Sequence, residues 1–226
     1  MCDDSPPRLK TAELEKLAST RLTALQAAGV SPHPVVNTTR SLARNFWGKA
    51  WMKQLAYCES GGMCLAPGRA LLRHSCVLDL QVESCSIRAI ISAEELYDVH
   101  LKLAPLDDER LSALATQCSN HVDSLLSLLE GKVDEALLQQ LCDPENGLLP
   151  TPGDWQMSCS CPDWSEPCPH AAAAIYAAGC LIDTDPRLLF QLRGITPEAL
   201  LSHPASTPEL NPEELSSTFG IDIDLF

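Results

Sequence analysis

The chain has 226 residues, of which 45% are apolar and 20% charged, so it is long enough for one or two folded domains and is not disordered throughout. Sixteen basic residues against 30 acidic ones give a formal net charge of −14, which excludes attraction of the whole molecule to nucleic acid. No apolar run approaches the ~18 residues of a membrane span, and the N-terminus lacks the apolar core of a signal peptide, so we expect a cytoplasmic protein without membrane contacts.

The N-terminal part is predicted to form two helices joined by a linker. Leucines at helical spacing predict a helix over 9–28, and a proline-containing extended stretch follows at 30–39. A second amphipathic pattern predicts a helix over 41–57, while the run 69–73 fits either a strand or a loop. Residues 1–40 are therefore predicted to be an N-terminal helix and linker.

The segment 40–73 differs in charge from the rest of the chain. It holds six basic residues and one acid, Glu59, which leaves the remainder with 10 basic and 29 acidic residues. Four of the cations follow one another at spacings of four or five, so they can share part of one helix face. We hypothesise that any nucleic-acid contact runs through this basic segment, and the alternative is that its cations pair with the excess acids. The candidate residues are Arg40, Arg44, Lys49, Lys53, Arg69 and Arg73.

The next part of the chain is predicted to be a small sheet. Apolar residues alternate with polar ones over 77–82, 87–91 and 96–103, which predicts three strands. The connections between these strands are short, as in an antiparallel meander.

Helices are predicted to follow the sheet. The helical period returns over 107–129, a shorter helix is predicted over 133–142, and a proline- and glycine-rich loop follows. Residues 41–150 are accordingly predicted to form one α+β domain that contains the basic segment and this helical pair.

The segment SCSCPDWSEPCPH has the spacing of a metal site. Cys159 and Cys161 are two residues apart, so in an extended segment they project to the same side and can bind one ion. Six residues then allow the chain to turn back, and Cys168 and His170 complete four ligands. Three thiolates and one imidazole suit a tetrahedral Zn²⁺ ion and leave no position for water. We therefore predict a structural zinc site rather than a hydrolytic one.

This CxCx6CxH pattern resembles the SWIM zinc finger, a family for which a ββα fold is predicted. Over residues 9–202 the chain is also similar to bacterial SWIM zinc finger family proteins. The resemblance implies zinc binding, a role in DNA or protein interaction, and often a Swi/Snf-type helicase as partner. Pro169 stands where related fingers often carry a basic residue, so we expect nucleic-acid contact to avoid the finger itself. The segments that carry the wider resemblance are 46–51, 67–83, 128–150 and 185–195.

The remainder is predicted to be a finger with short trailing helices. An alanine-rich helix is expected to begin at the last ligands, and two cap–proline pairs predict two further short helices within 151–202. Residues 203–226 are rich in proline and acids and are predicted to be an acidic flexible tail.

Two other sets of residues are weaker candidates. Trp155 and Trp164 bracket the finger, and we expect them to cover its apolar side rather than to stack on bases. Four cysteines without short paired spacing are expected to be small core residues, with a second metal site as the alternative. These are Cys58, Cys64, Cys76 and Cys85.

The sequence therefore predicts an α+β protein with a small antiparallel sheet, flanking helices and a C-terminal ββα-like SWIM zinc finger. It contains no phosphate-binding glycine loop, nucleophile elbow or paired-carboxylate motif, so we predict no enzymatic activity and no small-molecule substrate. The expected function is a non-catalytic zinc-binding interaction module, an accessory in DNA-related protein complexes such as those of a Swi/Snf-type helicase. The alternative is direct nucleic-acid binding through residues 40–73.

Overall fold

The computed structural model describes residues 11–196, apart from 38, 40, 120–138 and 144–145, together with residue 199. The predictions for Arg40, for most of the helical pair beyond residue 119, for most of the last trailing helix and for the tail 203–226 therefore lie outside the described residues. No helix in the described part of the chain is long and apolar enough to cross a membrane.

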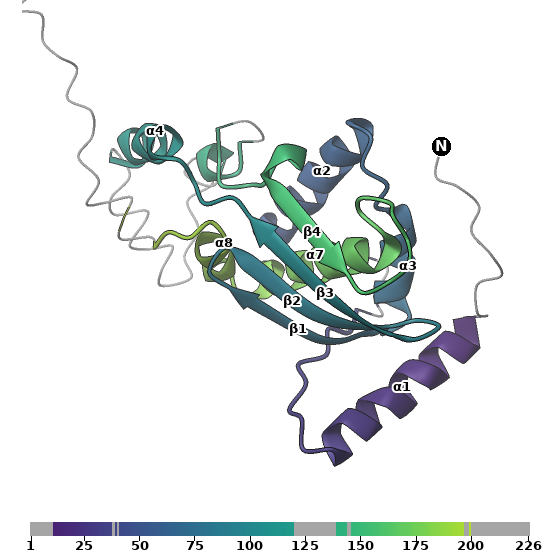
Figure 1. Cartoon of the computed structure of the whole chain (residues 1–226). Coiled ribbons are helices and arrows are strands. Elements are labelled where there is room, and N and C mark those ends of the chain that lie inside the picture. The colour runs from purple at the N-terminus through teal and green to yellow at the C-terminus, as the bar shows by residue number, and fades with distance from the viewer. Residues whose placement is uncertain are drawn as a thin grey trace, which may run out of the picture.

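A four-stranded antiparallel sheet forms the centre of the molecule (Figure 1). Strands β1 (Val77–Glu83), β2 (Ser86–Ser92) and β3 (Leu96–Leu103) form the predicted meander, and β4 (Trp155–Cys159) adds to the free edge of β3. The predicted α+β class with a small antiparallel sheet is confirmed. Because β4 ends at Cys159, the first predicted zinc ligand lies directly at the edge of this sheet.

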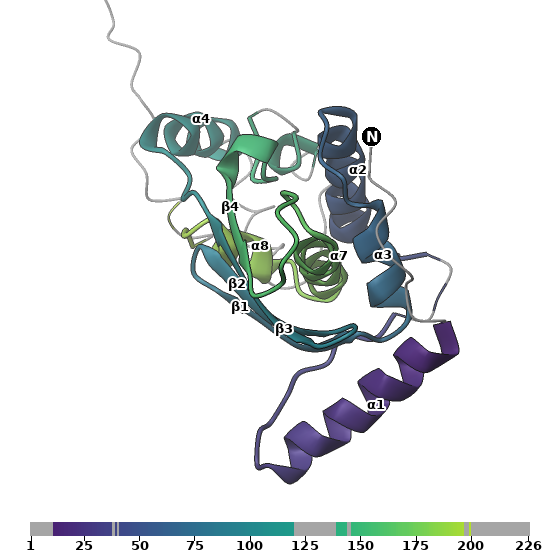
Figure 2. The same ribbon diagram turned by 45° about the vertical axis from the view of Figure 1, so that its right-hand side comes forward.

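Most of the helices lie on one face of the sheet, and α1 (Thr11–Ala27) lies on the other (Figure 2). The main face is covered by helices α7 (Pro169–Thr184) and α8 (Arg187–Leu192). Further helices are α2 (Phe46–Ser60), α3 (Ala66–Arg73), α4 (Asp108–Ser119) and the short 3-10 turn η1 (Pro152–Asp154).

Two predicted elements differ from the structure. The run 69–73 belongs to helix α3, whose Pro67 occupies the first turn and whose Leu72 is fully buried. Helix α2 begins at Phe46 rather than at residue 41, because the backbone N–H groups of Arg44 and Asn45 donate to the Asp183 carboxylate at 2.9 and 2.8 Å. These bonds hold the chain in a non-helical conformation before the helix starts.

Helix α7 is the centre of the hydrophobic core. It contacts all four strands on one side and α2 and α3 on the other, and eleven of its sixteen residues are buried. A helix that is buried all round must have small side chains where neighbours approach closely, which explains the run Ala171–Ala174. Trp51 of α2 is fully buried against it and donates its indole N–H to the Ile175 carbonyl at 3.1 Å. Strand β4 and helix α7 thus share one hydrophobic core with residues 77–103. The predicted domain boundaries remain a prediction.

Helix α1 is attached to the opposite face through a small apolar cluster and one arginine. Ala18 is buried there with Leu78 of β1. The Arg21 guanidinium donates to the Ser92 hydroxyl at 3.0 Å and to three backbone carbonyls of the β2–β3 turn at 2.8–2.9 Å. These acceptors are the carbonyls of Ala93, Glu94 and Glu95.

We expect Arg21→Ala to loosen α1 without unfolding the sheet. Four charge-assisted hydrogen bonds are lost, and because they are partly exposed the cost should be about 1–3 kcal/mol. Limited proteolysis should then cleave within residues 11–36 well before it cleaves the core. Lys16→Ala removes a cation from the exposed side of the same helix and should leave the proteolysis rate unchanged. Equal rates for the two variants would contradict the anchoring role of Arg21.

Candidate metal centre

The four predicted ligands come from the junction of β4 and α7. Cys159 is the last residue of β4 and pairs with Val99 of β3. The next residue, Ser160, donates its N–H to the Asp98 carbonyl at 3.0 Å, and its hydroxyl accepts from the Asp98 N–H at 3.0 Å. The CxC segment is therefore fixed to the edge of the sheet, while the finger loop, residues 160–168, returns the chain to the start of α7.

The second pair of ligands is set by the beginning of α7. Cys168 is the N-cap residue, and its sulfur accepts a hydrogen bond from the Ala171 N–H at 3.4 Å. Pro169 occupies the first helical position, where a missing N–H costs nothing, and His170 follows on the first turn. An electronegative sulfur at this place is stabilised by the positive end of the helix.

The ligand atoms of Cys159, Cys161, Cys168 and His170 all lie within 4.8 Å of one another. Zinc–sulfur bonds of about 2.3 Å in a tetrahedron require sulfurs about 3.8 Å apart, so the cluster needs only a small contraction around an ion. Cys168 and His170 are buried, and the other two ligands are half-buried. The prediction of a Cys3His cluster positioned to bind zinc is confirmed.

The electrostatics of the three sulfurs also fit a cation. The hydrogen bond between the Cys159 and Cys168 side chains lowers the pKa of Cys168 to about 4 and raises the pKa of Cys159. Burial raises the pKa of the Cys161 thiol. Three adjacent thiols thus share one favoured thiolate among them, because like charges at this distance repel. Bound Zn²⁺ supplies the positive charge that allows all three to ionise.

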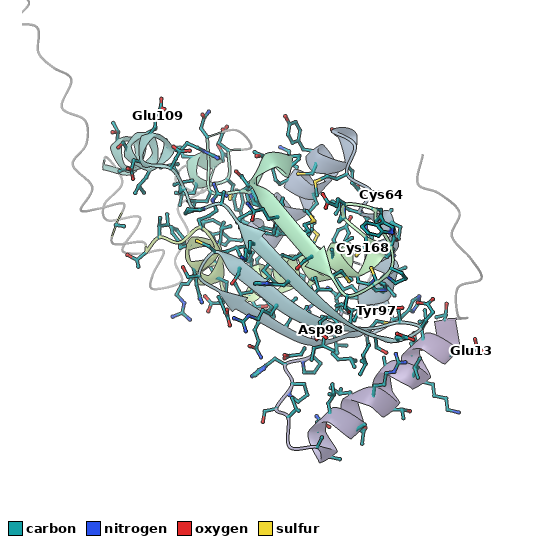
Figure 3. The ribbon with its side chains drawn as sticks, in the orientation of Figure 1. Glu13, Cys64, Tyr97, Asp98, Glu109 and Cys168 are labelled. Carbon is teal, nitrogen blue, oxygen red and sulfur yellow. The ribbon has the colours of Figure 1, made fainter. Side chains whose placement is uncertain are left out.

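Tyr97 of β3 completes the surroundings of the histidine. Its ring lies over the His170 imidazole with centroids 4.0 Å apart and an angle of 31° between the planes. Both side chains are buried, so the contact fixes the plane of the imidazole. Figure 3 labels Tyr97 and Cys168, which lie at the same end of the sheet. Sequence reasoning missed Tyr97, since its position in the alternating pattern of β3 indicates only that it faces the core.

The two tryptophans that bracket the finger have different environments. Trp155 is buried and packs edge-on against Trp51, with centroids 6.3 Å apart, so it belongs to the core of the molecule. Trp164 is 97% exposed, and the expectation that it covers the finger is wrong. It lies in a tight turn in which the Ser165 N–H donates to the Asp163 carboxylate at 2.9 Å.

The structure brings three of the five described cations of the basic segment together and leaves the other two apart. Lys49 of α2 lines the same cavity as Arg69 and Arg73 of α3. Lys53 is exposed one turn farther along α2, and Arg44 is exposed before that helix begins.

In the part of the chain that the structure describes, the candidates Cys58, Cys76 and Cys85 are free thiols that form no second metal centre, and Cys64 is disulfide-bonded rather than a small free core residue. Cys58 and Cys76 are fully buried, and burial raises the pKa of both thiols, as expected for small core residues. Among the residues that the structure describes, no second group of three or more metal-ligating side chains lies close enough to share an ion.

Comparisons with known proteins agree with this geometry. Residues 155–179 match the family model of the SWIM zinc finger, so the chain carries such a finger from β4 into α7. The chain is also 24% identical over 173 residues to the uncharacterized protein Rv2102 of Mycobacterium tuberculosis. That match covers 75% of this chain and 62% of the relative, so the similarity spans less than two thirds of the relative's length. No solved structure matches the chain.

Proposed function

We propose that this chain is a non-catalytic, zinc-dependent protein-interaction module that binds its partner through the finger loop. The loop is held at both ends by zinc ligands, Cys161 near its start and Cys168 at its end. Such a loop loses little conformational freedom when a partner binds, which favours affinity. The ligand set supports a non-catalytic role, because three thiolates and one imidazole fill the tetrahedron.

The exposed Trp164 carries this proposal. Tryptophan is the side chain most enriched at the energetic centres of protein interfaces, and this one is 97% exposed on a constrained loop. Asp163 and Glu166 flank it and are exposed as well. These carboxylates favour a partner with basic groups around an apolar pocket and disfavour contact with phosphates.

We further propose that the partner belongs to DNA-related protein complexes, with a Swi/Snf-type helicase as the first candidate. The support is the SWIM finger itself, since such fingers are often found in interaction or DNA-related roles. In this proposal the partner contacts DNA and this acidic chain acts as an adaptor, a role that its net charge of −14 supports.

Trp164→Ala should lower recovery of the helicase about tenfold or more in co-immunoprecipitation from nuclease-treated native extract. The variant should retain one zinc ion and an unchanged melting temperature, because the side chain packs against nothing. Tyr57→Ala is the matched control, since Tyr57 is 52% exposed on α2, away from the finger. Equal recovery of the helicase with wild type and Trp164→Ala, or its absence from the wild-type sample, would overturn the proposal.

Direct nucleic-acid binding is the second candidate function, and the convergence of Lys49, Arg69 and Arg73 on one cavity favours it. If all six cations of the basic segment contacted duplex phosphates, the logarithm of the binding constant would fall with the logarithm of the salt concentration with a slope of about −5. Fluorescence anisotropy with a labelled duplex tests this directly. If no binding is detected even at low salt, this second function is excluded and the protein-adaptor function is the proposal that stands.

A further inference from the structure

A basic cavity is lined by residues of α2, α3, α7 and the segment before α2. Helices α2 and α3 both pack on α7 (Figure 2). The volume of the cavity is about 310 Å³, and none of the described residues that line it is acidic. Two hydroxyl groups, those of Ser41 and Tyr176, and three cationic side chains line it. The cations are Lys49, Arg69 and Arg73.

The fold, rather than sequence proximity, brings these groups together. Arg69 and Arg73 are four residues apart, so they project from the same face of α3. Lys49 comes from α2, and Tyr176 comes from α7, the helix on which both α2 and α3 pack. Three cationic side chains in one concavity of an acidic protein create a local positive potential that attracts anions.

Arg69 is fixed at the wall of this cavity. Its Nη2 donates to the Tyr176 hydroxyl at 2.7 Å, and its guanidinium lies 5.0 Å from the centre of the Tyr176 ring. The Glu59 carboxylate lies 3.8 Å from Nη2 and offsets one positive charge. The Arg69 side chain is 43% exposed, so its guanidinium stays accessible at the cavity wall.

We propose that this cavity binds a phosphate group. Arginine presents a planar fork of donors that matches phosphate oxygens, and lysine adds a point charge. The volume equals that of about ten water molecules, which suits a phosphate with a small attached group. The site is separate from the finger loop, so it stands whether or not Trp164 binds a partner.

Isothermal titration with inorganic phosphate at constant ionic strength tests the site. Wild type should bind saturably, and Lys49→Glu/Arg73→Glu should weaken binding about tenfold or more. Lys53→Glu is the matched control, because Lys53 lies one turn from Lys49 on α2 but does not line the cavity; it should stay within about twofold of wild type. The neutral pair Lys49→Gln/Arg73→Gln repeats the test if charge reversal impairs folding. No saturable binding by wild type, or equal affinity in all variants, would overturn the proposal.

Competition experiments identify the source of the phosphate. A 5′-phosphorylated oligonucleotide, the same oligonucleotide with a 5′-hydroxyl, and adenosine monophosphate are each added to the phosphate-bound protein. Displacement by the first oligonucleotide alone assigns a strand end, displacement by both assigns the backbone, and displacement by the mononucleotide alone assigns a small phosphate ester. Each result supports the phosphate site, and the titration of the variants remains the test that can refute it.

Discussion

Removal of zinc is expected to destabilise the whole described fold in one cooperative transition, rather than the finger alone. Cys168 and His170 begin α7, and that helix forms the core against all four strands. Structural zinc contributes on the order of 10 kcal/mol in isolated fingers, which is comparable to the total stability of a typical domain. The metal-free chain should therefore be largely unfolded or should melt at a much lower temperature.

Urea unfolding followed by two probes measures this effect. Far-ultraviolet circular dichroism reports the helices and the sheet, and fluorescence of the buried Trp51 and Trp155 reports the core next to α7. With zinc and after chelation the two transitions should coincide, and chelation should shift both midpoints downward together. From the sequence alone, residues 155–182 would be expected to melt while the strands at 76–103 persist. The packing of α7 is the reason to expect otherwise.

Cysteine variants separate metal loss from general perturbation. Cys168→Ser should lose the zinc equivalent and reproduce the effect of chelation. Cys180→Ser is the control, because the Cys180 thiol donates a hydrogen bond to the Leu42 carbonyl at 3.3 Å and a serine hydroxyl can donate the same hydrogen bond. A full equivalent of zinc in Cys168→Ser, or a sheet signal that survives chelation at full strength, would contradict this prediction.

The sequence was sufficient for features that depend on local pattern. Alternation of apolar residues identified β1, β2 and β3, because each strand packs one face towards α7, although β1 also buries Leu78 under α1 on the other face. The metal centre could also be predicted from the sequence, since its four ligands fall within twelve residues and their chemistry is specific to few ions. Residues far away in the chain position the site rather than supply ligands: Asp98 and Val99 fix the CxC segment to the sheet, and the Tyr97 ring stacks on His170.

Features that depend on contacts between distant parts of the chain could not be predicted from the sequence. Helix α3 contains Pro67 and Gly68 within eight residues, so its local signal is weak, and its contact with α7 stabilises it instead. Strand β4 is short and adds to the sheet only because β3 offers a free edge. The convergence of Lys49 and Arg73 depends on α2 and α3 packing on the same helix, a relation that no spacing in the sequence encodes.

The contact between α3 and α7 leads to the second large expected effect, that of Gly68→Ala. A Cβ atom at Gly68 would lie 2.4 Å from the Ala172 carbonyl carbon and 2.4 Å from the Ala173 nitrogen. Both atoms belong to the backbone of α7, which is itself held between the sheet and its covering helices and cannot yield. We expect destabilisation of about 3 kcal/mol or more, with α3 displaced from the core.

The sign of this effect distinguishes packing from helix propensity. Alanine is favoured over glycine inside a helix by about 1 kcal/mol, so without the contact Gly68→Ala would stabilise the protein. Gly153→Ala is the matched control, because no atom lies within 4 Å of its Cβ position, and it should leave the urea midpoint nearly unchanged. A midpoint for zinc-loaded Gly68→Ala at or above that of wild type would mean that α3 can move away from α7 at no cost. A lower midpoint in this variant alone would show that the close approach of the two helices is a main source of stability for the face that carries Arg69.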